Sequence, residues 1–374
     1  MQRDFRIDAA RGIALFTIVL THMPGHSWAH WTLRSYGFSD AAEAFVLLAG
    51  IAAGMAYGRP QVQSAWVLTT LRSGKLAGAH LLLTMGALSV AMIAAIFGAD
   101  SLVQMHGMAP LAEGEPAYWA GVFLGSHQIG YVNILTLYVV LIALVPLFFW
   151  GFRISVPATL AMSALVWVIV GIWQISPVNW PSQGSWQFNP FAWQVLFAIG
   201  LAFGWRKANG RPIVLPRWTV PVAGAVLIGA LLWRQLPMVA EAGRSGLEPV
   251  WDYAIGAHVL GFHKPSLGGM RLLHALALGC IIAQIPVFIR IAGSAAMAPF
   301  RSFGRHGLVL FCLGTLISFT GQVILLDGPS FVGRDTVIAI TAFALLWAVA
   351  WALDQNVAQK KVARRAAKAR AQEV

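Results

Sequence analysis

Long apolar stretches alternate with short polar segments along almost the whole chain. Ten of these stretches approach or reach the length of about 20 residues that an α-helix needs to cross a bilayer. The pattern predicts an all-α, polytopic membrane protein with ten transmembrane helices. The predicted spans are 8–23, 40–57, 77–98, 131–150, 156–175, 190–205, 218–235, 268–289, 306–326 and 336–353.

Composition supports a membrane protein, and the cysteines and motifs of the chain predict no metal site. The 374 residues are 58% hydrophobic and only 11% charged, whereas a soluble domain carries about 25% charged residues. Cys280 and Cys312 both lie in apolar stretches, so no disulfide framework is expected. The sequence has no HExxH motif, no Walker A motif and no GxSxG motif, and no bound metal is predicted.

Lysine and arginine are distributed very unequally between the two sides of the predicted membrane. Of the 26 Lys and Arg residues, 20 fall on one side, five on the other, and Arg271 lies inside a span. The positive-inside rule then places both termini in the cytoplasm. Residues 1–353 form the predicted transmembrane domain, and 354–374 form a basic cytoplasmic tail on the anionic inner leaflet or in disorder. The net charge of +12 therefore indicates membrane topology and not nucleic-acid binding.

The first span contains an arginine and a histidine on one helical face. Arg11 and His22 are eleven residues apart, about three turns and about 16 Å along the axis. Ionisable groups inside a membrane helix are costly and mark functional sites. The next span opens with Asp40 and Glu43, which we expect to reach His22, fix its tautomer and make it a general base. The alternative is a helix-capping pair of carboxylates and an interfacial histidine.

Basic residues also stand at the predicted cytoplasmic ends of spans. A phosphate-bearing donor substrate requires such cations, although ordinary positive-inside bias is the alternative. The candidates for donor binding are Arg11, Arg72, Lys75, Arg301, Arg305 and His306.

Polar residues inside later spans are expected to face a shared interior cavity, and each alone could instead join two helices. They are Asn133, Gln194, Arg271 and His274. Exposed aromatic residues in the predicted outer loops, Trp186, Trp251 and Tyr253, are typical of a sugar-binding mouth, and equally of helix anchors at the interface.

Several segments resemble a known family. RDFRIDAARGIALFTIVLTHMPG and YGFSDAAEAFVLLAGIAAGMAYGR are similar to OpgC-type membrane acyltransferases, which succinylate osmoregulated periplasmic glucans, and so are FNPFAWQVLFAIGLAFG, KPSLGGMRLLHALALG and FGRHGLVLFCLGTLISF. The resemblance runs from about residue 3 to about residue 350. The spacing of Arg11 and His22 is similar to the motif of the wider acyltransferase-three superfamily, in which the histidine is held to be essential.

The resemblance implies a ten-span enzyme of the bacterial inner membrane that moves an acyl group from cytoplasmic acyl-CoA to a sugar hydroxyl outside. Acyl-CoA, with succinyl-CoA as the expected form, is then a co-substrate and not a tightly bound cofactor. The expected partners are a periplasmic glucan or another envelope polysaccharide and membrane lipids. The distal carboxylate of a succinyl group needs a cation, for which Arg34, Lys264 and Arg271 are candidates.

Two other classes of function remain open at this stage. A secondary transporter would use the Arg, His and Glu residues as a proton relay. Many transporters consist of two similar halves, but the ten predicted spans show no obvious five-plus-five repeat of helices broken by Gly or Pro. A structural or sensor protein would use the same residues only to join helices. Direct transfer and a covalent acyl-enzyme also both remain open.

Overall fold

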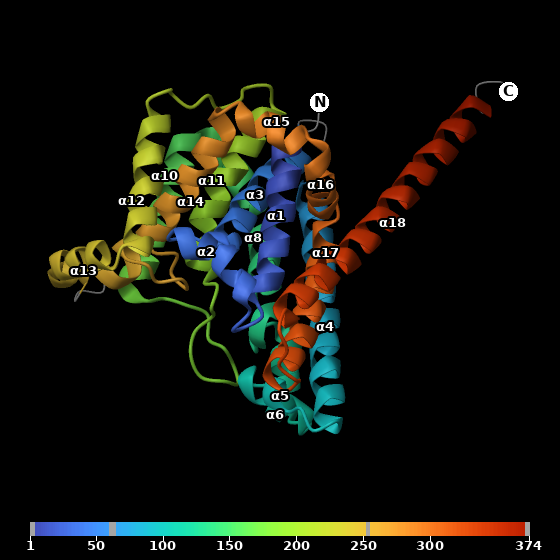
Figure 1. Ribbon diagram of the computed structural model, residues 1–374. Helices are drawn as coiled ribbons and strands as arrows, with labels where there is room; N and C mark the ends of the chain where they lie inside the picture. Colours follow the sequence, from blue (N-terminus) through green and yellow to red (C-terminus); the bar gives the residue numbers. More distant parts are fainter. Residues whose placement is uncertain (1–3, 60–64, 252–254, 371–374) are drawn as a thin grey trace.

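The computed structural model describes residues 4–59, 65–251 and 255–370 and consists of helices joined by loops (Figure 1). These residues contain no β-strand, only an isolated bridge between Val178 and Ser185. The predicted all-α class is confirmed. The longer helices are α1 (Phe5–Thr21), α3 (Ala41–Tyr57), α4 (Ala65–Ile96), α8 (Ile134–Ala143), α9 (Val145–Ile154), α10 (Val156–Trp173), α11 (Pro190–Ala208), α12 (Thr219–Gln235), α13 (Pro237–Trp251), α14 (Gly269–Gln284), α17 (Gly307–Leu326) and α18 (Arg334–Arg370).

Short helices connect the long ones and shape both ends of the bundle. They are η1 (Ser27–Trp31), α2 (Leu33–Tyr36), α5 (Ser101–Met105), α6 (Ala109–Ala112), α7 (Pro116–Leu124), η2 (Gly130–Val132), η3 (Ile255–Leu260), α15 (Val287–Gly293), η4 (Ala295–Met297) and α16 (Ala298–Arg305).

Each predicted span overlaps a helix or a pair of helices separated by a short break. The break between α8 and α9 lies next to Pro146, and the two helices are bent by 40°. Pro286 separates α14 from α15, which are bent by 81°. Proline lacks the backbone N–H and its ring clashes with the carbonyl four residues earlier, so it bends or ends a helix.

Four helices of the described chain are long and apolar enough to cross a membrane, and the number rises to seven if each bent pair is one span. The other helices are too short or too polar to count as candidate spans by length and hydropathy. One of them, α11, has twelve buried residues and is surrounded by protein, so it does not have to be apolar on every side. These four to seven candidate spans indicate a membrane protein, while ten spans and cytoplasmic termini remain predictions. The start of α1 and the end of α18 lie at the same end of the bundle (Figure 1).

Two helices are longer than the predicted spans. Helix α4 begins at Ala65 and not at 77, so Arg72 and Lys75 lie within the helix. Helix α18 continues through Asp354 to Arg370, so the proposed boundary between domain and tail falls inside one helix. A hydropathy pattern marks where a helix becomes polar, and a helix can continue beyond that point.

Helices α3 and α11 cross at very short range because each presents glycines to the other. An added Cβ at Gly50 or Gly54 would overlap the backbone carbonyl of Phe197 or Leu201. An added Cβ at Gly204 would overlap the carbonyl of Ile51 in the opposite direction. Small residues four positions apart allow such close packing, which drives helix association in membranes. This contact holds the middle and the last turns of α3 against α11.

A second close contact joins α1 to α16. An added Cβ at Gly12 would overlap the carbonyl of Phe300, and one at Gly304 would overlap the carbonyl of Asp8. The side chain of Arg11 lies beside this crossing, where it donates to the carbonyls of Gly304 and Leu48 at 3.3 and 3.2 Å. Helix α1 is thus fixed at one end near Arg11, and its other end carries His22.

We expect Gly204→Ala to destabilise the protein by about 1–3 kcal/mol, because the new methyl group must push α11 away from α3. The control is Gly224→Ala on α12, where an added Cβ meets no atom within 4 Å. There alanine should be neutral or slightly stabilising, since it favours the helix more than glycine does. Thermal unfolding of the two detergent-solubilised variants measures the difference, and equal melting temperatures would contradict the assigned helix contact.

Candidate active site

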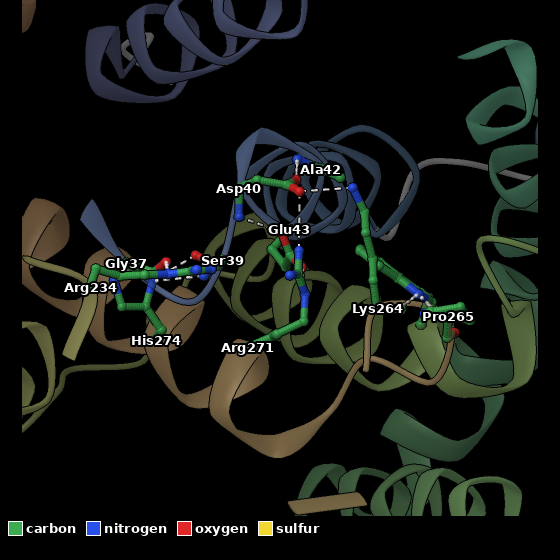
Figure 2. Close-up of polar contacts among 11 residues, drawn as sticks. Gly37, Ser39, Asp40, Ala42, Glu43, Arg234, Lys264, Pro265, Arg271 and His274 are labelled. Carbon is green, nitrogen blue, oxygen red and sulfur yellow. Dashed lines mark hydrogen bonds and ion pairs between the residues drawn. The ribbon is translucent and has the colours of Figure 1, made fainter. Parts of the chain in front are cut away.

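Two carboxylates at the start of α3 are bound by two cations from the region of α14 (Figure 2). Arg271 donates from Nε to Glu43 Oε1 at 2.7 Å and from a terminal nitrogen to Asp40 Oδ2 at 3.1 Å. Lys264 Nζ lies 2.7 Å from the same Asp40 oxygen. Glu43 is fully buried and Arg271 is only 8% exposed. We refer to these four residues as the ionic network.

The same carboxylates also cap α3. Asp40 Oδ1 accepts from the amide of Ala42 at 2.8 Å, and Glu43 Oε2 accepts from the amide of Asp40 at 2.8 Å. The capping pair weighed as the alternative is therefore present. The expected hydrogen bond of Asp40 or Glu43 to His22 is not found among the described residues, which corrects that expectation. Both carboxylates instead contact Arg271, because α14 packs against α3.

Lys264 belongs to a loop that is held in place from two sides. The indole nitrogen of Trp193 on α11 donates to the carbonyl of Lys264 at 3.1 Å. The indole nitrogen of Trp167 on α10 donates to the carbonyl of Leu267 at 3.1 Å. The ammonium group of Lys264 lies 5.3 Å from the ring centroid of Phe188, close enough for a cation–π contact. Lys264 is thus directed toward Asp40 by fixed neighbours.

His274 positions the chain segment that leads into α3. Its Nδ1 lies 2.7 Å from the hydroxyl of Ser39, and its ring packs against Gly37 (Figure 2). Arg234, at the end of α12, donates to the carbonyl of Gly37 at 3.0 Å. His274 is only 2% exposed and does not line the cavity described below, which corrects the expectation that it faces the substrate.

His22 terminates α1 and is oriented by stacking and through its backbone. Its imidazole stacks on Tyr131 with centroids 3.9 Å apart and planes 17° apart. Its carbonyl accepts from Gln322 Nε2 at 2.5 Å, and Gln322 Oε1 lies 2.7 Å from His106 Nε2. The ring nitrogen Nδ1 is buried and has no hydrogen-bond partner among the described residues. An aromatic face therefore orients the imidazole, in place of the expected carboxylate.

A cavity of about 610 Å³ opens beside His22 and Tyr131. Its volume lies within the range of about 300–1,000 Å³ typical of small-molecule sites. Four cations line it, together with a single carboxylate, Asp40, so its wall is positively charged. The polar and charged lining residues are Thr21, His22, Arg34, Ser39, Asp40, His106, Tyr131, Asn133, Gln187, Arg234, Lys264 and Arg271.

Several other candidates lie away from this cavity. Gln194 exchanges hydrogen bonds of 2.6 and 2.8 Å with the hydroxyl and carbonyl of Ser163, and so joins α11 to α10. This contact corrects the expectation that Gln194 faces the cavity. Trp186 is not among the lining residues either. Tyr253 and the side chain of Trp251 lie outside the described residues.

At the opposite end of α1, the expected donor-binding residue Arg11 donates to the carbonyls of Gly304 and Leu48. Three more of the expected donor-binding residues there are also engaged by protein groups. Arg305 and His306 both contact Asp354 of α18, His306 Nε2 at 2.9 Å. Arg301 donates to the carbonyls of Ala292 and Ser294, each at 2.6 Å. These contacts fasten α16 to α18 and α15, which gives the three cations a structural role that sequence analysis did not include.

Arg72 and Lys75 differ from those three cations. Neither makes a hydrogen bond or ion pair within the described ranges; Arg72 is half-buried and Lys75 is exposed on α4. These two side chains keep their donors available for a ligand at that end of the bundle.

A sequence model of the OpgC protein family matches residues 3–357. The chain belongs to the OpgC protein family. No curated protein and no solved structure matches it. Membership of the OpgC family suggests a glucan-modifying acyltransferase, for which the His22 cavity is the candidate active site.

Sequence analysis missed four residues around His22 in this OpgC-family chain. Tyr131, His106 and Gln322 orient the imidazole and its backbone, and Arg234 lines the cavity wall. A weak signal existed for Tyr131, which stands two residues before the predicted Asn133, and for Gln322, which is a polar residue within an apolar span. Neither residue lies near His22 in the sequence, so only the packing of α17 and η2 reveals the contact.

We expect Arg271→Met to destabilise the protein by about 3–5 kcal/mol, because it leaves the buried Glu43 without a cation. The double variant Arg271→Met, Glu43→Gln should recover part of this loss, since the unpaired charge is removed. Denaturant or thermal unfolding of these two variants, of Glu43→Gln and of the parent gives a double-mutant cycle, which measures the coupling of the two residues. Strictly additive losses would show that Arg271 and Glu43 are not energetically coupled.

Proposed function

We propose that the protein is an integral-membrane O-acyltransferase that moves an acyl group, succinyl in the first instance, from acyl-CoA to a hydroxyl of a periplasmic glucan. The observation that supports this proposal most is the position of His22. It ends α1 beside a cavity whose wall carries four cations, in a chain of the OpgC family.

His22 is proposed as the general base. Its neutral imidazole takes the proton of an acceptor hydroxyl as the oxygen attacks the thioester carbonyl. The C–S bond then breaks, and the imidazolium returns the proton to the leaving thiolate. No net proton is gained or lost, and the products are an ester and free CoA thiol. A covalent acyl-enzyme remains an alternative route to the same products.

Tyr131 and Gln322 are proposed as positioning residues for this step. Stacking on Tyr131 limits the rotation of the imidazole, and the bond from Gln322 to the His22 carbonyl fixes the end of α1. A base must lie within hydrogen-bond reach of the proton it accepts. The position of His22 among the lining residues of the cavity supports such a contact with an acceptor sugar bound there.

The cationic wall is proposed to select a dicarboxylic acyl group. Lys264 and Arg271 are already paired with Asp40, whereas Arg34 makes no hydrogen bond or ion pair with the described residues. An arginine can bind a carboxylate with two parallel hydrogen bonds. Arg34, with Arg234 beside it on the wall, is therefore the proposed partner of the distal carboxylate of a succinyl group.

The donor is proposed to enter from the end of the bundle that holds Arg72 and Lys75. The topology predicted from the charge distribution supports this route, because it puts that end in the cytoplasm, where acyl-CoA is made, and the His22 cavity on the periplasmic side. The phosphates of CoA would contact Arg72 and Lys75, while the thioester extends along α1 toward His22.

The ionic network bears on the alternative of a transporter. Both of its carboxylates are held by cations and by backbone amides at once. A closed set of this kind is better suited to a fixed scaffold than to a proton relay, whose groups must exchange partners. This observation favours the acyltransferase.

We expect His22→Ala to lower acyl transfer by about 10²- to 10⁴-fold, the usual effect of losing a general base. Mass spectrometry of the periplasmic glucan should show acylated species with the parent protein and none without it. The added mass identifies the acyl group. The structural control is His80→Ala, which removes another buried histidine from a different helix, α4.

His80→Ala should alter stability and leave acylation per folded molecule close to that of the parent. Tyr131→Phe should keep the stack and most of the activity, while Tyr131→Ala should lose both. Normal acylation by a stably inserted His22→Ala protein would remove His22 from the mechanism.

On the donor side, we expect Arg72→Ala to weaken succinyl-CoA binding by about 10- to 100-fold, the loss of one charge-assisted contact. Added salt should weaken binding further, because part of the attraction is screened. Arg217→Ala is the matched control, since Arg217 is an exposed cation predicted to lie on the same side. Titration of the purified variants with succinyl-CoA measures the affinities. Equal affinities of Arg72→Ala and Arg217→Ala would show that Arg72 does not bind the CoA phosphates.

A further inference from the structure

A second open groove lies next to the His22 cavity. It has a volume of about 690 Å³ and is lined by side chains of η1, α2 and the end of α12. Its aromatic and polar side chains include His30, Trp31, Arg34, Tyr36, Arg234 and Gln235. None of the aromatic residues in this groove was singled out by sequence analysis. We refer to it as the outer groove.

The walls of the outer groove are fixed to neighbouring helices. On one side, the amide of Ser27 donates to Asp335 at 2.7 Å and the indole of Trp28 donates to Thr336 at 3.2 Å, both on α18. On the other side, Gln235 of α12 donates to the carbonyl of Ser35 at 2.9 Å. A segment held in this way from two sides presents its side chains in a defined arrangement, as a binding platform requires.

The two large aromatic side chains of the groove are exposed. Trp31 is 79% exposed and Tyr36 is 37% exposed. Exposed single aromatic residues are normal, but Trp31 and Tyr36 line one groove together with Arg34, Arg234 and Gln235. Flat aromatic faces stack on the C–H faces of pyranose rings, and Arg, Gln and His donate or accept at the ring edges. This mixture of groups suits a carbohydrate better than a lipid chain.

The outer groove and the His22 cavity share two residues. Arg34 and Arg234 line both spaces, so the two are neighbours along one surface. A polymer bound in the outer groove would therefore reach the cavity with one of its units. A small acceptor would need only the cavity, whereas a long glucan can use both.

We propose that the outer groove is a glucan-binding subsite, which holds glucose units next to the one that receives the acyl group, with Trp31 as its stacking residue. This inference rests on the proposed function, because it assumes that the acceptor is a glucan. It differs from the proposed function in that glucan binding to the groove requires neither the donor nor the chemical step.

The test measures equilibrium binding of unacylated glucan, isolated from cells that lack this protein, to the purified full-length chain without any acyl donor. We expect Trp31→Ala to lower the affinity at least about tenfold, the usual effect of truncating a central aromatic contact. Trp31→Tyr should restore most of it, since tyrosine also offers a flat face. Because Trp31 is 79% exposed, its removal leaves the packing of the fold unchanged.

The matched control is Trp173→Ala at the end of α10, a tryptophan that is 66% exposed and does not line either space. It should bind glucan like the parent. Equal losses in Trp31→Ala and Trp173→Ala would show that both residues only anchor the protein at the interface. Parent-like binding by Trp31→Ala would also overturn the subsite.

The two proposals fail separately. If the parent acylates glucan while its glucan affinity does not depend on Trp31, the subsite is wrong and the proposed function stands. If glucan binding depends on Trp31 but no acyl group is ever transferred, the subsite stands and the acyltransferase proposal fails.

Discussion

The salt bridge between Arg271 and Glu43 is the interaction on which the arrangement of the site depends. A buried ion pair adds little net stability, because each charge loses its hydration. It is highly directional, however, and an unpaired partner would be very unfavourable in the membrane. Arg271 comes from α14 and Glu43 from α3, so the pair fixes two helices that are far apart in the sequence. Lys264 and Asp40 extend the pair to the loop before α14. The start of α3 and one wall of the cavity are thereby held together.

The cations of the chain divide into those that build the structure and those that remain available to ligands. Arg271, Lys264, Arg301 and Arg305 all have carboxylates or carbonyls as partners, and each joins separate elements. Arg34 on the cavity wall and Arg72 on α4 have no such partner within the described ranges. Both groups look alike in the sequence, since a positive-inside pattern counts charges without showing their partners. The proposed mechanism assigns ligands only to the second group, which is why it uses fewer cations than the sequence offered.

Sequence patterns predicted the helices well and their contacts poorly. Hydropathy located every long apolar helix, because burial in lipid imposes length and composition directly. It also identified Arg271 as an unusual residue, since a cation inside a span is costly wherever it points. The partner of Arg271 was missed because Asp40 and Glu43 are close to His22 in the sequence, and proximity along the chain favoured a triad. In the structure both carboxylates pair with Arg271, because a carboxylate binds a cation more strongly than a neutral imidazole. The glycine contacts of α3 and α11 could have been predicted from the sequence by a search for small residues four positions apart.

The position of His22 follows from constraints on its neighbours more than on its own side chain. Its carbonyl is bound by Gln322, whose other end meets His106, and its ring rests on Tyr131. The imidazole is therefore held by a face and by the backbone, while no carboxylate in the described part of the chain is in hydrogen-bond contact with it. A carboxylate partner would stabilise the imidazolium and make the ring a stronger base, at the expense of holding the proton longer. In the proposed reaction, a base without a carboxylate partner would release its proton more readily to the leaving thiolate. For the proposed thioester transfer, in which the leaving group needs little help to depart but the hydroxyl must lose its proton, a neutral and well-oriented imidazole would be sufficient.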